Sequence, residues 1–217
     1  MATFVRTWLT PPMPNPDRHN LPRLPRPDYQ AFAAVFWTMR VEPDQPGWLD
    51  RDFHRQFREL LTHASAREQL FCPTYVLMPD HLHLVLLGLA VKSDQLNAVK
   101  FLRLHLNRLL AGGELVSFTP SPRPRPWALQ HQAHDTVLGE EQRKRGAFAS
   151  VCFYTLANPV RAALAKTERD WPYLGAILPG YPDLHPMEPD YWECFWKLYA
   201  KFREPTPTEP PSAKQEN

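Results

Sequence analysis

Residues 71–89 have the sequence FCPTYVLMPDHLHLVLLGL, in which two strand patterns are separated by a turn. Residues 71–78 and 81–89 are rich in aromatic, aliphatic and β-branched side chains, and Pro79-Asp80 between them is a turn signal. A connection this short joins antiparallel neighbours. We therefore expect a β-hairpin at the centre of the fold.

The second strand of this hairpin begins with a His-x-His pair, His81 and His83. Because side chains alternate along a strand, both imidazoles project from one face, and Leu82 and Leu84 project into an apolar layer on the other. Two imidazoles on one rigid strand can share a divalent cation. Most such pairs are surface histidines, but the position of this one, directly after a tight turn at the open end of a sheet, favours a metal site.

The sequence on both sides of the hairpin alternates between strand and helix patterns. An aromatic and β-branched run predicts a buried strand, and apolar spacings of three and four residues predict amphipathic helices, the first of them capped by Asp50. The order β-α-β-β-α-β-α predicts an α+β fold, an antiparallel sheet with helices packed on one face. The predicted segments are a strand at 31–41, a helix after Asp50, a helix at 94–110, a strand at 127–138, a helix at about 140–165 and a helical aromatic cap at 171–203.

The predicted helix after residue 140 carries a tyrosine on its polar side. Tyr154 and Asn158 are four residues apart and share a stripe with small and cationic residues, whereas Phe148, Cys152 and Leu156 form a separate apolar stripe. A tyrosine commonly packs with only its tip hydrogen-bonded. The polar stripe favours an exposed hydroxyl, and Pro159 should loosen the helix just beyond Asn158.

These four residues together predict one reaction. A tyrosine phenolate can attack phosphorus and keep the ester-bond energy in a phosphotyrosine. Because DNA phosphates repel that anion, a divalent cation is needed to neutralise charge. Two imidazoles and one amide oxygen would supply three ligands, a mixed nitrogen and oxygen set that suits Mg²⁺ or Mn²⁺.

The composition of the chain is compatible with DNA binding but does not by itself indicate it. The chain has 217 residues and a formal net charge of only +2, but residues 92–145 hold nine Lys/Arg against five Asp/Glu, and residues 167–217 hold five against nine. A basic middle suits contact with phosphates, and an ordinary uneven surface is equally compatible. Three cysteines without metal-ligand spacing, no long apolar run and no secretory signal predict a cytoplasmic protein without a membrane partner.

Two stretches resemble a known family. YVLMPDHLHLVL (75–86) resembles the HUH motif of single-tyrosine transposases, and FYTLANPVRAALAKTERDWPYLGA (153–176) resembles the Tyr-x-x-x-Asn-Pro-Val-Lys/Arg signature of REP-associated tyrosine transposases. WALQHQAHDTVL (127–138) is similar to the segment that precedes this signature. The resemblance implies a ferredoxin-like (RRM-like) core over about residues 29–178. It is more specific than either motif alone because the motifs come in the family's order.

The resemblance also implies roles for individual residues. His81 and His83 match two metal ligands, Asn158 matches the third, and Tyr154 matches the nucleophile that forms a 5′-phosphotyrosine. The partner would be single-stranded or hairpin DNA at imperfect palindromes, and the protein would be nucleoid-associated when bound. REP-associated transposases look monomeric, whereas related insertion-sequence enzymes resemble swapped dimers with the tyrosine supplied in trans. We therefore expect a monomer, with a homodimer as the alternative. Our candidates for phosphate contacts, each equally compatible with solvated surface, are Lys100, Arg103, Arg108, Arg123, Arg125, Arg143 and Arg161.

The proline-rich segments fall outside this resemblance. The chain has 25 prolines against eight glycines, gathered in residues 11–27, 120–126 and 205–211, where sheets and helices are disfavoured. We expect a flexible arm at 1–28, the transposase domain at 29–178, a helical aromatic extension at 179–203 and a disordered tail at 204–217.

Two other functions stay open at this stage. A domesticated relative could bind repeat hairpins without cutting them. An unrelated phosphodiesterase could use His81 and His83 to activate water, but it would leave Tyr154 and Asn158 without a role.

Overall fold

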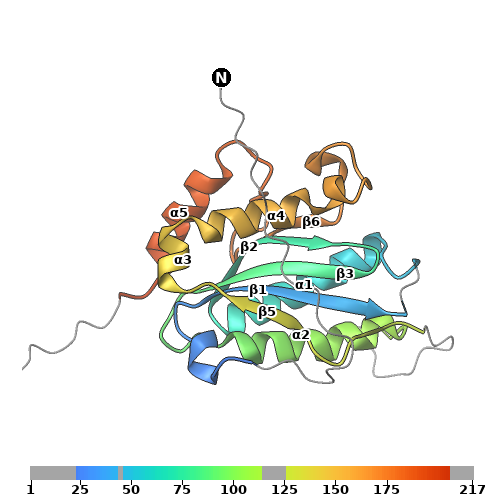
Figure 1. The fold of residues 1–217 in the computed structure, drawn as a ribbon, viewed down its shortest axis with the longest axis horizontal. Coiled ribbons are helices and arrows are strands. Elements are labelled where there is room, and N and C mark those ends of the chain that lie inside the picture. Colours follow the sequence, from blue (N-terminus) through green and yellow to red (C-terminus); the bar gives the residue numbers. More distant parts are fainter. Residues whose placement is uncertain (1–22, 44–45, 114–125, 206–217) are drawn as a thin grey trace, which may run out of the picture.

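The computed structural model describes residues 23–43, 46–113 and 126–205, and an antiparallel sheet of six strands lies at its centre. The strands follow the spatial order β4-β1-β3-β2-β6, and β5 pairs with β1 as well (Figure 1). The α+β class and the antiparallel sheet are thus confirmed. The strands are β1 (Ala34–Glu42), β2 (Leu70–Leu77), β3 (His81–Gly88), β4 (Ala128–Leu129), β5 (His134–Val137) and β6 (Leu174–Ile177).

The hairpin predicted at 71–89 is formed by β2 and β3, with Leu77 opposite Leu82 next to the turn. β1 pairs with the other edge of β3, so β3 lies inside the sheet. Leu82 and Leu84 are fully buried in the larger hydrophobic core, as the alternation pattern predicts. The strand that carries the histidines is therefore held on both edges by backbone pairing.

Two helices, α1 (Arg51–Arg67) and α2 (Gln95–Leu110), cover the face of the sheet that holds Leu82 and Leu84. Both begin at an aspartate whose side chain accepts a hydrogen bond from a backbone N–H: Phe53 N–H donates to Asp50, and Asn97 N–H donates to Asp94. Such caps satisfy amides that lack a partner within the helix. The predicted Asp50 cap is confirmed.

The opposite face is covered as well, which corrects the expectation that helices pack on one face only. In Figure 1, α4 (Ala147–Arg161) and α5 (Tyr191–Phe202) lie at the top of the view, α2 lies at the bottom, and the sheet lies between them. Val85 and Leu87 project to the α4 side and are as buried as their neighbours. A strand that is apolar on both sides needs a cover on both sides.

Three predicted boundaries change in the structure. The helix expected at 140–165 is divided into α3 (Glu140–Lys144) and α4 by Gly146, whose φ of 84° no other residue type adopts easily. The strand expected at 127–138 is two short strands, β4 and β5, on successive parts of one edge of β1. The helical cap expected at 171–203 begins with a strand, β6, which pairs with β2 before α5 follows.

Two short 3-10 helices complete the described fold: η1 (Arg26–Tyr29) and η2 (Glu168–Asp170). None of the described helices has the length and apolar character needed to cross a membrane. α5 packs through Tyr191 and Phe195 against the α4 side of the sheet. The aromatic extension therefore belongs to the hydrophobic core on the α4 side of the sheet and is not a separate body.

Candidate functional site

The two histidines of β3 project from the α4 side of the sheet, opposite the layer of α1 and α2. Their Nε2 atoms lie 3.0 Å apart. His83 is buried, with 6% of its surface exposed, and His81 is half-buried. The period of two along the strand thus brings both rings to one point, as predicted.

Each ring is held through its other nitrogen. Asp80 Oδ1 lies 2.6 Å from His81 Nδ1, and Thr38 Oγ1 on β1 lies 2.8 Å from His83 Nδ1. Arg40, also on β1, donates from Nη2 to Asp80 Oδ2 over 3.4 Å. Since a carboxylate only accepts, His81 Nδ1 is the donor of this pair, and in the neutral ring Nε2 carries the lone pair. Neighbours that hold the second nitrogen of each imidazole are typical of histidines that bind metals.

Tyr154 lies on α4 beside these rings. Its ring centroid is 5.9 Å from that of His83 and 6.1 Å from that of Phe36, which itself stacks on His83 at 5.0 Å. The Arg161 guanidinium lies 5.0 Å from the centre of the Tyr154 ring. The hydroxyl of Tyr154 forms no hydrogen bond with any residue in the described part of the chain, although the residue is half-buried. The predicted nucleophile therefore borders the predicted metal ligands within one chain.

Asn158 follows one helical turn after Tyr154 and is 8% exposed. Along α4, Phe148 and Cys152 pack near Val85 and Leu87, whereas Leu156 packs against Val76 and Met78. Met78 N–H donates to His81 O, so this end of the helix lies over the His81 end of the hairpin. The Asn158 Nδ2 atom is buried and has no hydrogen-bond partner among the described residues. A buried amide NH₂ without a partner among the described residues is unusual, and as a donor it would be satisfied by an acceptor such as a phosphate or water oxygen.

The donor geometry fits a divalent cation. Two nitrogen ligands at about 2.1 Å from a metal and at right angles to each other are about 3.0 Å apart, which is the separation of the two Nε2 atoms. No group of three or more His, Cys, Asp or Glu side chains in the described residues could hold a metal. A cation at this point would therefore depend on His81, His83 and an amide such as Asn158, with water or substrate oxygens as further ligands.

The burial of His83 has an electrostatic consequence. Desolvation, and then the neighbouring His81, holds the pKa of His83 well below its ordinary value. The ring is therefore neutral at physiological pH and keeps one unprotonated nitrogen. That is the form in which an imidazole binds metal.

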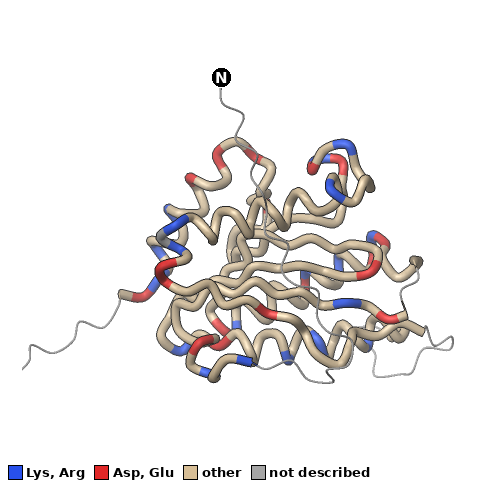
Figure 2. The backbone as a smooth tube through the Cα atoms, viewed as in Figure 1, with Lys and Arg blue, Asp and Glu red and all other residues tan. Residues whose placement is uncertain are grey.

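The predicted phosphate contacts do not form one surface. Lys100 and Arg108 are exposed on α2, on the far side of the sheet from the histidines. Arg103 donates from Nη2 to the backbone carbonyls of Gln130 and His131, which favours a structural role. The α2 sequence contains no carboxylate, and Figure 2 shows its basic positions on the side of the fold opposite α4. α2 is therefore a separate basic element.

The other basic candidates differ in their surroundings. Arg143 donates from Nη1 to Phe32 O over 3.1 Å, whereas Arg161 is exposed and lies over the Tyr154 ring. Arg123 and Arg125 lie outside the described residues. Arg161 is thus the candidate that lies beside the tyrosine.

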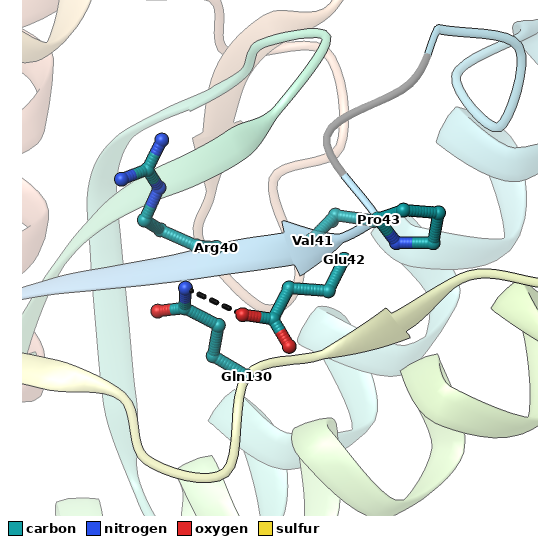
Figure 3. A pocket seen from close by; sticks show the side chains of 5 residues that line it. All are labelled: Arg40, Val41, Glu42, Pro43 and Gln130. Carbon is teal, nitrogen blue, oxygen red and sulfur yellow. Dashed lines mark hydrogen bonds between the residues drawn. The ribbon is translucent and has the colours of Figure 1, made fainter. Parts of the chain in front are cut away.

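Sequence reasoning did not single out Phe36, Thr38 and Arg40. They alternate along β1 on the face shared with the histidines, and Thr38 and Arg40 are the cross-strand partners of His83 and His81. The alternation within residues 31–41 was visible in the sequence, but the register against β3 was not. Arg40 also borders a shallow groove with Val41, Glu42, Pro43 and Gln130, in which Gln130 Nε2 donates to Glu42 Oε1 over 2.8 Å (Figure 3).

Comparison with known proteins relates the chain to one fold. No family model matches the sequence, and no curated protein matches it significantly. Among solved structures, a REP-associated tyrosine transposase bound to a REP hairpin superposes with a TM-score of 0.53 and 14% sequence identity. The match covers 71% of this chain and 81% of that one. The protein therefore shares the fold of that transposase.

Proposed function

We propose that the protein is a divalent-cation-dependent, single-tyrosine DNA transposase or endonuclease that cuts and rejoins single-stranded DNA beside hairpins. The observation that carries this proposal is the contact between Tyr154 and His83, whose rings are 5.9 Å apart, at the point where the His81 and His83 Nε2 atoms meet. A nucleophile beside two imidazoles, with a buried amide one helical turn further along α4, supplies parts that phosphoryl transfer to tyrosine needs.

The reaction we propose is a transesterification. Tyr154 Oη attacks the phosphorus of a DNA phosphodiester, a P–O bond to tyrosine forms, and the bond between phosphorus and the 3′ oxygen breaks. The phenol proton passes to solvent, and the departing oxygen takes up a proton as a 3′-hydroxyl. The 5′ phosphate stays on Tyr154, and attack by another 3′-hydroxyl rejoins the DNA.

The residues around Tyr154 each support this step. His81, His83 and Asn158 would hold Mg²⁺ or Mn²⁺, which when bound would polarise the phosphate and offset its growing negative charge. Arg161 lies over the tyrosine ring and is exposed, so its guanidinium can both position the ring and meet a phosphate. Because Tyr154 and the histidines come from one chain, the reaction needs no second copy, which favours a monomer.

The sheet offers a path for a DNA strand to this centre. α4 packs over β2 and β3, whereas Phe36, Thr38 and Arg40 on β1 are only half-buried. The β1 surface formed by Phe36, Thr38 and Arg40 lies next to Tyr154, and at Arg40 it borders the groove. A half-exposed aromatic ring beside a cationic side chain suits single-stranded DNA, which stacks its bases and neutralises its phosphates. The hairpin bound by the structural neighbour supports DNA of this kind as the partner.

The test is covalent capture. The full chain is incubated with Mn²⁺ and a 5′- and 3′-labelled pool of hairpin oligonucleotides with randomised stems and flanks, and adducts are resolved under denaturing conditions and sequenced. We expect an adduct that retains the label 3′ of the cut, is lost in Tyr154→Phe and persists in Tyr173→Phe, a control at another half-buried tyrosine.

Two outcomes would overturn the proposal. Hairpins that are retained by the wild-type protein but never form an adduct would indicate a binding module. Strand cleavage that continues in Tyr154→Phe would indicate a phosphodiesterase in which water replaces the tyrosine.

A further inference from the structure

A third histidine projects from the same face of the sheet as His81 and His83. His134 lies on β5 and is the cross-strand partner of Thr38, which is in turn the cross-strand partner of His83. Directly opposite residues of antiparallel strands project to the same side, so these three side chains form one row across the sheet. His134 is half-buried, and the reaction proposed above gives it no role.

The two ends of this row lie on opposite sides of β1. β3 pairs with one edge of β1 and β5 pairs with the other (Figure 1). Neighbouring strands are about 4.8 Å apart, so the backbone of His134 lies about 10 Å from that of His83. Tyr154 reaches the row from the β3 side, because α4 packs over β2 and β3 and the tyrosine ring contacts His83 and Phe36. A phosphate above Thr38 would therefore have Tyr154 on one side and His134 on the other.

The strand β5 is anchored so that the His134 ring stays on this face. Asp135 projects to the opposite face, where the Tyr29 hydroxyl donates to Asp135 Oδ2 over 2.5 Å and Arg23 Nε lies 3.5 Å from Asp135 Oδ1. Tyr29 is fully buried in the core beneath α1 and α2. Among the described residues, none forms a hydrogen bond with the His134 ring. The backbone therefore fixes the place of the ring, and no described side chain occupies its nitrogens.

The departing 3′ oxygen needs a proton, and His134 lies on the side from which this oxygen would leave. Displacement at phosphorus places the attacking and the departing oxygen roughly in line, on opposite sides of the phosphorus atom. With Tyr154 as the attacking group, the 3′ oxygen points toward β5. Histidine is the side chain that most often transfers protons in enzymes, because its ordinary pKa is close to neutral pH.

We propose that His134 is the catalytic acid that protonates the 3′ oxygen as its bond to phosphorus breaks. The imidazolium gives one proton to that oxygen, Tyr154 Oη bonds to phosphorus and loses its proton to water, and the ring regains a proton from water. In the rejoining step the neutral ring takes the proton of the attacking 3′-hydroxyl, and the tyrosine oxygen leaves and is protonated by water. The inference rests on the proposed function, since it concerns the same reaction.

The charges around His134 suit a group that exchanges its proton. Burial lowers the pKa of His134 below its ordinary value, Asp135 acts in the opposite direction, and Arg40 on β1 lowers it further. A phosphodiester anion beside the ring would favour the protonated form. The ring would thus take up a proton as DNA binds and be ready to give it to the departing oxygen.

The experiment compares two leaving groups in the same protein. The hairpin recovered by covalent capture is prepared with the natural 3′ oxygen at the scissile phosphate and, separately, with sulfur in place of that oxygen. A thiol is a far stronger acid than an alcohol, so a thiolate leaves without a proton. His134→Gln removes the acid and keeps a polar side chain, and His131→Gln, at an exposed histidine of the preceding loop, is the matched control. Rates of adduct formation are measured with saturating hairpin and Mn²⁺.

With the oxygen substrate, His134→Gln should lower the rate of adduct formation about 10²- to 10⁴-fold, which is the usual contribution of a general acid. With the sulfur substrate it should react as fast as wild type, which also shows that the variant is folded and binds DNA. The hairpin dissociation constant, from fluorescence anisotropy with cations chelated, should stay close to that of wild type. His131→Gln should match wild type on both substrates.

The outcomes distinguish the two proposals. An unchanged rate with the oxygen substrate, or an equal loss with both substrates, overturns the role of His134 and leaves the proposed function standing. A wild-type protein that forms no adduct with any hairpin of the pool overturns the proposed function and the role of His134 with it.

Discussion

Replacing Asn158 by aspartate tests the third metal ligand through stability rather than through activity. The side chain is 8% exposed, and its Nδ2 has no partner in the described residues, so Asn158→Asp keeps the shape and adds a charge at a buried position. A buried charge left without a partner costs about 3–5 kcal/mol. We expect most of that loss in the free energy of unfolding when divalent cations are chelated, lessened where the carboxyl takes up a proton.

A cation should reverse the loss if the carboxylate faces it. A ligand that binds only the folded state stabilises by RT ln(1 + [L]/Kd), which is about 2.7 kcal/mol at one hundred times the dissociation constant. If the added charge tightens binding tenfold, the variant gains about 1.4 kcal/mol more than wild type at the same Mn²⁺ concentration. The variant is therefore expected to be less stable than wild type without Mn²⁺ and to respond to Mn²⁺ more steeply.

Urea unfolding over a series of Mn²⁺ concentrations measures both quantities. Asn107→Asp is the matched control, because Asn107 is also a helical amide, accepts from Leu129 N–H through Oδ1 and lies on α2, away from the histidines. It should show no greater Mn²⁺ response than wild type. An Asn158→Asp protein that loses stability but gains no more from Mn²⁺ than the control would refute the placement of Asn158 beside the cation.

Two further predictions concern parts of the fold away from the cation. Burial, followed by a nearby arginine, lowers the pKa of His54 from 6.5 to about 4. The unfolded chain therefore binds the proton more readily, and stability that is present above pH 6.5 is lost as the pH falls toward 4. His54→Gln should remove about 1–2 kcal/mol of the loss between pH 7 and pH 5 in urea unfolding, and an equal loss in both proteins would contradict the assignment. Gly88→Ala would place a Cβ 1.7 Å from Ala31 O, so the backbone must move and the cost should exceed the about 3 kcal/mol of ordinary overpacking. Gly139→Ala, whose Cβ meets nothing closer than 3.7 Å, changes only the N-cap residue of α3 and should lower the thermal midpoint far less, and similar midpoints for both variants would disprove the clash.

Local patterns were sufficient to predict the elements that form the site. The period of two in HLHLVLL gives the shared face of the histidines, and the capped apolar spacing after Asp50 gives α1. The stripe that separates Tyr154 from Phe148 and Cys152 gives the side of α4 that borders the histidines. Each of these features depends on residues within a few positions of one another, which is the range over which a sequence pattern can be interpreted.

Long-range placement could not be predicted in the same way. The pairing of Thr38 with His83 joins residues 45 positions apart, and a shift of one residue would have turned Thr38 to the other face. The strand β6 is only four residues long, and it forms because the edge of β2 is available to pair. The guanidinium of Arg103 binds the carbonyls of a loop whose position no local pattern contains.

The charge of the proposed metal ligands connects the structure of the site with the proposed function. His81 and His83 are neutral donors when they bind metal and Asn158 is an amide, and the described residues contain no cluster of carboxylates and histidines that could hold a metal. A neutral set of ligands leaves most of the charge of a divalent cation uncompensated. That charge is then free to attract the DNA phosphate, which would contribute oxygen ligands of its own. Phosphate oxygens of the DNA would therefore replace water in the coordination of the metal, so cation and DNA should each strengthen the binding of the other by the same factor.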